Sequence, residues 1–161
     1  MDSINDAVLE YTTQLRKGQI QKAYKGIMGF MSGLRAYFEK RCPEYIVSNI
    51  YYGYMDMTYF ALTPADFKQK KLKIAVVYLH EQGKFEVWLA GSNKKIQADY
   101  IKLLRRKDTG KYALSEALPG VDSIIETTLI EKPDFDHPEE LKERMAAKII
   151  PFVDDMRSLL A

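Results

Sequence analysis

The sequence predicts an α+β fold in which helices flank a four-stranded mixed or antiparallel sheet. Apolar residues recur at helical spacing near both ends of the chain, and the segments between them are rich in β-branched and aromatic residues. No repeat or Pro/Gly-rich linker interrupts this pattern. Since 161 residues are enough to bury a core, residues 1–161 are expected to form a single α+β domain.

Two N-terminal helices are predicted, over residues 3–16 and 20–41, on either side of Gly18. The second helix carries small residues beside its apolar stripe. Glycine costs a helix roughly 1 kcal/mol relative to alanine, so a close neighbour is expected there: another helix, the sheet, a ligand or a second subunit. These small residues are Gly26, Gly29, Gly33 and Ala36.

The central segments predict strands. Residues 50–62 are aromatic and β-prone, which is typical of a strand. Residues 63–66, Thr-Pro-Ala-Asp, are typical of the start of a short helix. Two further strands, at 72–80 and 85–90, are predicted to be joined by a hairpin turn at 81–84.

The C-terminal half adds one middle basic helix, one strand and a closing C-terminal helix. The basic helix is predicted over residues 94–107, and residues 123–130 alternate well enough for a fourth strand. Asp136 can cap the last helix, in which Pro151 predicts a kink.

The composition argues against several classes of protein. No run approaches the roughly 18 apolar residues of a membrane span, and residues 1–6 lack the basic-then-apolar pattern of a signal peptide. A cytoplasmic location without a membrane partner is therefore expected. The single cysteine, Cys42, cannot form an intramolecular disulfide, and with only two histidines a zinc site is not expected. No cofactor is predicted.

Basic residues are concentrated in the middle of the chain. Residues 68–111 hold twelve basic and four acidic side chains, while residues 112–161 hold five basic and eleven acidic ones. One explanation is a nucleic-acid-binding surface, on which the basic side chains would pair with phosphates and aromatic rings would stack on bases. The other is that the two segments neutralise each other across the fold. The candidate nucleic-acid-binding residues are Lys70, Lys71, Lys73, Lys94, Lys95, Lys102 and Arg105.

Asp56 lies among aromatic residues in the strand predicted over 50–62. A carboxylate there is hydrogen-bonded, exposed, or raised in pKa by burial, and functional sites collect such groups. A structural aspartate bonded to tyrosine hydroxyls is the alternative. Polar groups next to aromatic rings are the usual lining of a small-ligand site. The candidate ligand-binding residues of this kind are Asp56, Tyr52, Tyr54, Thr58 and Glu86.

The predicted order of helix, three strands, helix, strand and helix resembles the core of the restriction-endonuclease-like (PD-(D/E)XK) superfamily. That resemblance implies an acid on the second core strand and an acid-x-lysine on the third, which together hold a divalent metal. Glu86 occupies the place of the first acid of the pair, but Trp88 falls where the lysine belongs. Tyr78 and His80 occupy the positions where the other acid is expected. One match in three implies a catalytically degenerate relative.

The run from Tyr52 to Leu104 also resembles a family of small, uncharacterised bacterial proteins known only as a domain of unknown function. The segments that carry this resemblance are Leu72–Val76, Phe85–Leu89 and Gly91–Gln97. It covers most of the chain and implies a bacterial, cytosolic origin, but the family has no activity to carry over.

These observations favour a non-catalytic cytosolic binding or interaction domain, because the residue sets of hydrolytic, redox and transfer chemistry are missing. Its partner would be a small molecule or a protein, and a homodimer through the glycine-bearing helix is a further expectation. Two alternatives remain open. One is a nucleic-acid-associated, catalytically degenerate restriction-endonuclease-like domain, and the other is an enzyme that uses Asp56 and Glu86 as acid and base.

Overall fold

The computed structural model describes residues 3–118 and 120–161, which fold into five helices and one five-stranded sheet. All strand pairs are antiparallel, and the strands lie in the order β1-β2-β3-β4-β5. The strands are β1 (Tyr45–Val47), β2 (Met57–Pro64), β3 (Leu72–Leu79), β4 (Lys84–Gly91) and β5 (Ser123–Ile130). The helices are α1 (Ile4–Arg16), α2 (Gln19–Arg41), α3 (Ala65–Gln69), α4 (Lys94–Leu104) and α5 (Pro138–Leu160).

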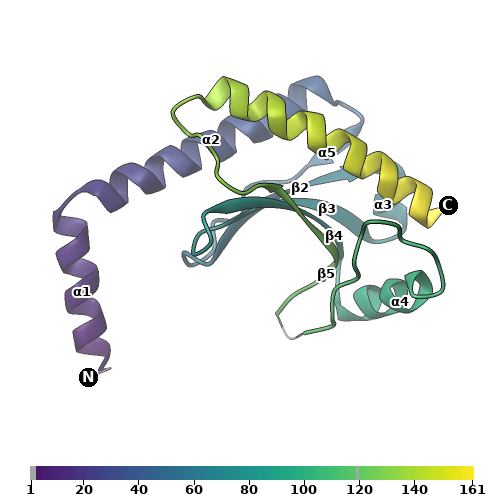
Figure 1. The fold of residues 1–161 in the computed structure, drawn as a ribbon, viewed down its shortest axis with the longest axis horizontal. Coiled ribbons are helices and arrows are strands. Elements are labelled where there is room, and N and C mark those ends of the chain that lie inside the picture. Colours follow the sequence, from purple (N-terminus) through teal and green to yellow (C-terminus); the bar gives the residue numbers. More distant parts are fainter. Residues whose placement is uncertain (1–2, 119) are drawn as a thin grey trace.

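One face of the sheet is covered by α5 and the second half of α2 (Figure 1). Successive residues of a strand point to opposite faces, so alternate positions of β2, β3 and β4 supply the core under these helices. We call this the covered face. Its fully buried side chains include Phe60, Ile74 and Val87 from the sheet, Leu34 and Phe38 from α2, and Met145 and Ile149 from α5.

The opposite side of the sheet is concave, and neither α2 nor α5 reaches it (Figure 1). We call it the open face. The middle of the open face carries a separate, smaller apolar cluster of Ala75, Val77 and Trp88. Helix α4 lies below one end of the sheet and packs against β4 and β5. Among the described residues no helix covers the centre of this face, and its side chains bury one another instead, since Val77, Ala75 and Trp88 are 0%, 3% and 8% exposed.

Helix α1 and the first turns of α2 extend away from the sheet (Figure 1). No residue of α1 is buried, and Ile4 is 77% exposed. Ile20, at the start of the predicted apolar stripe of α2, is also exposed, and the buried residues of that helix begin at Phe30. Both helices were predicted correctly, but the first part of their apolar surface has no partner within the described chain.

The α+β class and the antiparallel option are confirmed, whereas the count of four strands is wrong. The prediction omitted β1, which has three residues and is too short for a periodic pattern. The first predicted strand, 50–62, begins only at Met57, because Gly53 and Met55 have left-handed φ angles of 73° and 67° that an extended strand excludes. The short helix expected after residues 63–66 is present as α3, although its N-cap is Pro64 rather than Thr63. It brings the number of helices to five, one more than the four of the predicted architecture.

The helix that closes the chain begins one residue later than predicted, since its N-cap is His137 rather than Asp136. Its first turn holds Pro138, Glu139 and Glu140, which suit the positive end of the helix dipole. None of the helices in residues 3–118 and 120–161 is both long and apolar enough to cross a membrane.

Candidate functional site

Large and very small side chains alternate on the open face of the three central strands. Ala75 of β3 lies directly opposite Trp88 of β4, and Lys73 lies opposite Ala90. Tyr59 of β2 is a diagonal neighbour of Ala75 on the same face. Because the two alanines end at Cβ, the rings of Tyr59 and Trp88 rise above a low floor.

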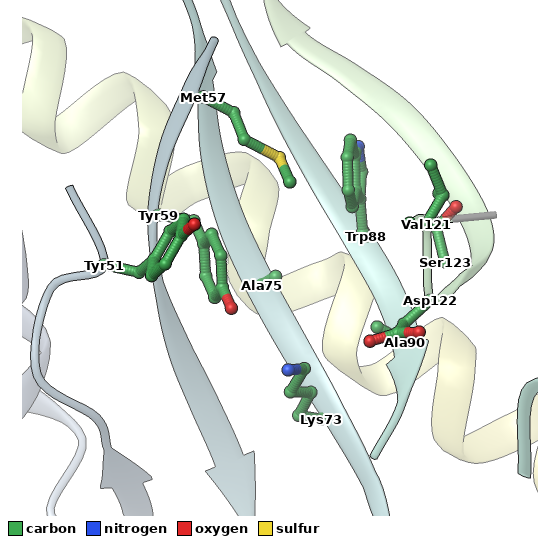
Figure 2. Close-up of a pocket in the computed structure, with 11 residues that line it drawn as sticks. Tyr51, Met57, Tyr59, Lys73, Ala75, Trp88, Ala90, Val121, Asp122 and Ser123 are labelled. Atoms are coloured by element: carbon green, nitrogen blue, oxygen red, sulfur yellow. The ribbon is translucent and has the colours of Figure 1, made fainter. Parts of the chain in front are cut away.

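The resulting cavity, which we call the aromatic slot, has a volume of about 250 Å³. Figure 2 shows the tyrosine rings on one side of Ala75 and the indole ring of Trp88 on the other. Met57 lies at one end, and Lys73 and Asp122 lie at the opposite end. The side chains that define the slot are Tyr51, Tyr59, Lys73, Ala75, Trp88 and Asp122.

The tyrosine wall of the slot is tied to the sheet through the backbone. The backbone N–H of Tyr51 donates to the carbonyl of Tyr59 at 2.7 Å, and the N–H of Tyr59 donates to the carbonyl of Tyr51 at 2.9 Å. Their ring centroids are 5.1 Å apart. The Lys73 ammonium lies 5.5 Å from the centre of the Tyr59 ring, within the range of a cation–π interaction. These contacts hold the backbone of the tyrosine wall against the sheet and place a cation over the Tyr59 ring.

The opposite wall is the Trp88 indole, which is held by a buried carboxylate. Trp88 Nε1 donates to Glu86 Oε1 at 2.7 Å, and Lys84 Nζ lies 3.0 Å from Glu86 Oε2. Trp88 and Glu86 are only 8% and 7% exposed. A buried carboxylate is costly unless its oxygens are satisfied, so these two donors make Glu86 a stable support that orients the indole.

The segment before β5 closes the lower end of the slot and is anchored by α4. Lys94 Nζ donates to the backbone carbonyls of Leu118 and Val121, and Gln97 Nε2 donates to the carbonyl of Ser123 at 2.8 Å. This anchoring requires Gly91, because a Cβ there would lie 2.8 Å from the backbone nitrogen of Gln97.

The ligand-binding residues predicted from the sequence are not brought together. Asp56 lies in an exposed bend before β2, where the Tyr54 N–H donates to Oδ1 at 3.0 Å. Backbone N–H groups, that of Tyr54 first, lower the pKa of Asp56. Of the three alternatives for this carboxylate, it is therefore hydrogen-bonded and exposed rather than raised in pKa by burial. Thr58 is fully buried on the covered face, whereas Glu86 lies on the open face. Tyr52 is exposed, and Tyr54 is 90% exposed.

The two carboxylates of the proposed acid–base pair have separate partners. Asp56 accepts a hydrogen bond from its own loop, and Glu86 accepts one from Trp88. No hydrogen bond joins them among the described residues. The same region of the chain contains no group of three or more His, Cys, Asp or Glu side chains that could hold a metal ion. Cys42 is buried, and burial raises the pKa of its thiol.

The basic residues suggested for nucleic-acid binding fall into different environments. The Ser92 N–H donates to the Lys71 carbonyl at 3.0 Å, which places the turn at 70–71 beside the start of α4. Lys94 is engaged by backbone carbonyls, and Lys95 lies 3.4 Å from Asp99. Lys73 lies in the aromatic slot, and Lys102 and Arg105 are exposed on or next to α4. Their contact with nucleic acid stays a prediction.

Two of the small residues of α2, Gly26 and Gly29, have no close neighbour of the kind expected. A Cβ added at Gly26 or Gly29 would meet no described atom within 4 Å beyond the helix itself, and at Gly33 it would meet only Lys142 Nζ, at 3.7 Å. Close packing of the sheet or another helix against Gly26 and Gly29 is therefore not found among the described residues. A ligand or a second subunit at this strip stays a prediction.

Sequence reasoning missed the slot as a unit, although it named some of its residues. Lys73 was suggested for nucleic-acid binding, and Trp88 was compared with the lysine of the endonuclease motif, whereas Tyr59 was given no role. The usable signal was the alternation of β3 and β4, in which Ala75 and Ala90 occupy the same face as Trp88. Small residues beside a large ring on a strand face indicate a cavity when no helix covers that face.

No curated protein and no solved structure matches this chain. One family model does match, and it covers residues 4–160, nearly the whole sequence. This confirms the resemblance to an uncharacterised family that was inferred from the central segments. The chain belongs to the family described as Domain of unknown function (DUF7000).

Proposed function

We propose that this chain is a non-catalytic binding protein that holds a small planar ligand in the aromatic slot. The observation that carries this proposal is the pair of aromatic walls, Tyr59 and Trp88, on either side of the low floor at Ala75. Aromatic rings pack well against other flat rings. The Trp88 indole is held by its hydrogen bond to Glu86, and the backbone of Tyr59 is held by its pairing with Tyr51. This order in the free protein limits the conformational entropy that is lost when a ligand enters.

The size of the slot limits the ligand. A volume of about 250 Å³ lies below the roughly 300–1,000 Å³ of pockets for drug-sized molecules. A compound with a single ring and a short polar substituent fits this size. The floor and walls would contact the ring, and the polar groups at the lower end would contact the substituent.

The polar groups around the slot support binding rather than turnover. Ser123 donates to Glu126 Oε2 at 2.6 Å, so its hydroxyl is already engaged, and neither His80 nor Cys42 lines the cavity. We also propose that the chain acts in the cytoplasm as a single domain. The match of one family model over residues 4–160 supports the single domain, and the free thiol of Cys42 suits a reducing compartment.

Trp88 is the only tryptophan of the chain, so its intrinsic fluorescence reports on the slot directly. Benzyl alcohol and benzamide serve as simple one-ring ligands that do not emit in the same range. We expect saturable changes in Trp88 emission with the parent protein. In the variant Ala75→Leu, which raises the floor of the slot, we expect affinity to fall by about tenfold or more, as for other steric changes in a small pocket.

Thr63→Leu is the matched control, because Thr63 lies on the same face of β2 but outside the slot. This variant should bind as the parent does, and thermal melts should show that both variants are folded. Equal binding by Ala75→Leu and the parent would rule out the slot as the site. A lack of any saturable response to one-ring compounds would rule out the proposed function.

A further inference from the structure

Two opposite charges lie at the same end of the aromatic slot. Lys73 projects from β3, and Asp122 precedes β5 by one residue. Figure 2 shows the Lys73 ammonium and the Asp122 carboxylate at the same end of the slot, below the aromatic rings, with Asp122 drawn over Ala90. The register explains this arrangement, because Lys73 pairs with Ala90 and Ala90 pairs in turn with Ser123.

These two charges do not neutralise each other. Neighbouring strands lie about 4.8 Å apart, so the backbones that carry Lys73 and Asp122 are separated by two such spacings, with only the methyl group of Ala90 between them. In the described residues neither side chain forms an ion pair within 4.0 Å. By contrast, Lys84 and Glu86 on the same face lie 3.0 Å apart. The end of the slot thus offers a cation and an anion with a space between them.

We propose that the ligand is a free aromatic α-amino acid. This inference rests on the proposed function, since it specifies the ligand of the same slot. The ring would lie between Tyr59 and Trp88. The α-carboxylate would then pair with Lys73 and the α-ammonium with Asp122, because one carbon atom carries both groups and can place them in the gap above Ala90.

The two charges also select against relatives of this ligand. A compound with a carboxylate alone leaves Asp122 next to a second negative charge, and one with an ammonium alone leaves Lys73 next to a second positive charge. Like charges brought together in a partly enclosed site weaken binding. The amino acid is therefore expected to bind about tenfold or more tightly than either singly charged analogue.

Four phenyl compounds test this inference through Trp88 fluorescence, because none of them emits in the tryptophan range. They are L-phenylalanine, 3-phenylpropionate, 2-phenylethylamine and benzyl alcohol. We expect L-phenylalanine to bind most tightly. Lys73→Met should lower the affinity for L-phenylalanine and 3-phenylpropionate by about tenfold, and the affinity for 2-phenylethylamine should stay the same or increase. Asp122→Asn should lower the affinity for L-phenylalanine and 2-phenylethylamine by about tenfold, and the affinity for 3-phenylpropionate should stay the same or increase. Lys68→Met, at an exposed lysine outside the slot, is the control.

The outcomes separate the two proposals. If all four compounds bind with similar affinity and Ala75→Leu abolishes that binding, the slot is a ligand site but the amino-acid assignment is overturned. The same holds if neither Lys73→Met nor Asp122→Asn changes the order of affinities. If none of the four compounds binds, the proposed function itself fails.

Discussion

The covered face and the open face of the sheet are made by alternate residues of the same strands, yet they are built differently. On the covered face of β2, Phe60 is fully buried, and the one polar neighbour, Thr58, donates to the Tyr52 carbonyl at 2.8 Å. On the open face, Ala75 leaves space beside Trp88, and Lys73 has no ion pair among the described residues. Helices pack against the covered face, whereas the open face keeps a cavity of about 250 Å³ beside the buried Trp88. This difference is the reason for proposing that the open face contacts another molecule.

The largest expected effect compares two adjacent residues of β2. Phe60→Ala should lower the free energy of unfolding by about 3–5 kcal/mol, because it opens a cavity in the core. Tyr59→Ala should cost about 1 kcal/mol or less, because Tyr59 is only half-buried and faces the slot. Urea denaturation at equilibrium measures both. Similar losses for the two variants would show that the open face is a second core rather than a site.

The next effect concerns the support of the indole wall. Trp88→Phe keeps a ring in the slot but removes the donor to Glu86 Oε1. Leaving a buried acceptor with one donor fewer should cost about 1–3 kcal/mol, measured by urea denaturation. Tyr51→Phe is the control, because it removes only the hydroxyl of a half-exposed ring. If Trp88→Phe is as mild as this control, the bond between Trp88 and Glu86 does not stabilise the wall.

A smaller, pH-dependent effect is expected at the polar position of the covered face. His80 Nε2 lies 2.8 Å from Thr58 Oγ1, and since that hydroxyl donates to the Tyr52 carbonyl, the neutral imidazole is the donor to it. Burial lowers the pKa of His80. The unfolded chain therefore binds a proton more readily, so stability should fall as the pH drops below about 6.5 and approaches the lowered pKa.

Thermal melts of the parent and of His80→Gln between about pH 7.5 and pH 5 test this expectation. The variant should lose less stability on acidification than the parent does. His137 provides a contrast, because the Asp134 carboxylate raises the pKa of this exposed imidazole. Its contribution is present below about pH 6.5 and is lost as the pH rises through the raised pKa. A parent and a His80→Gln variant with identical pH profiles would contradict the role of His80.

The smallest expected effect concerns α1, which contacts neither face of the sheet. Removal of residues 1–17 should change the free energy of unfolding by about 0.5 kcal/mol or less, because none of the residues in α1 is buried. Ligand binding in the slot should be unchanged. Urea denaturation and the Trp88 titration measure these two properties. A loss of several kcal/mol would show that α1 is a part of the folded core.

The sequence predicted those elements whose stability depends on a long periodic pattern. The closing helix α5 and the strands β3 and β4 are examples, and α5 buries one apolar side through Met145, Ile149 and Phe152. The prediction from sequence was wrong where the φ angle of a single residue decides the path of the chain. The left-handed conformation of Gly53 turns the chain before β2, which moves Asp56 into a loop.

The candidate site was harder to predict than the fold because it depends on register. Tyr59, Ala75 and Trp88 lie on three strands, and a shift of one residue in any pairing would send one of them to the covered face. Asp122 reaches the slot only because the segment before β5 is bonded to α4. Neither the register of the strands nor the contact between α4 and the segment before β5 can be predicted from the hydrophobic pattern of a single segment.

The order of the strands also has a consequence for how the protein folds. Each strand pairs with the next one along the chain, and only residues 80–83 separate β3 from β4. Local pairings lose little loop entropy and form early. We therefore expect the pairs between β2, β3 and β4 to form first, and these pairs bring Tyr59, Ala75 and Trp88 side by side. Asp122 should join them last, because the long segment that contains α4 separates β4 from β5.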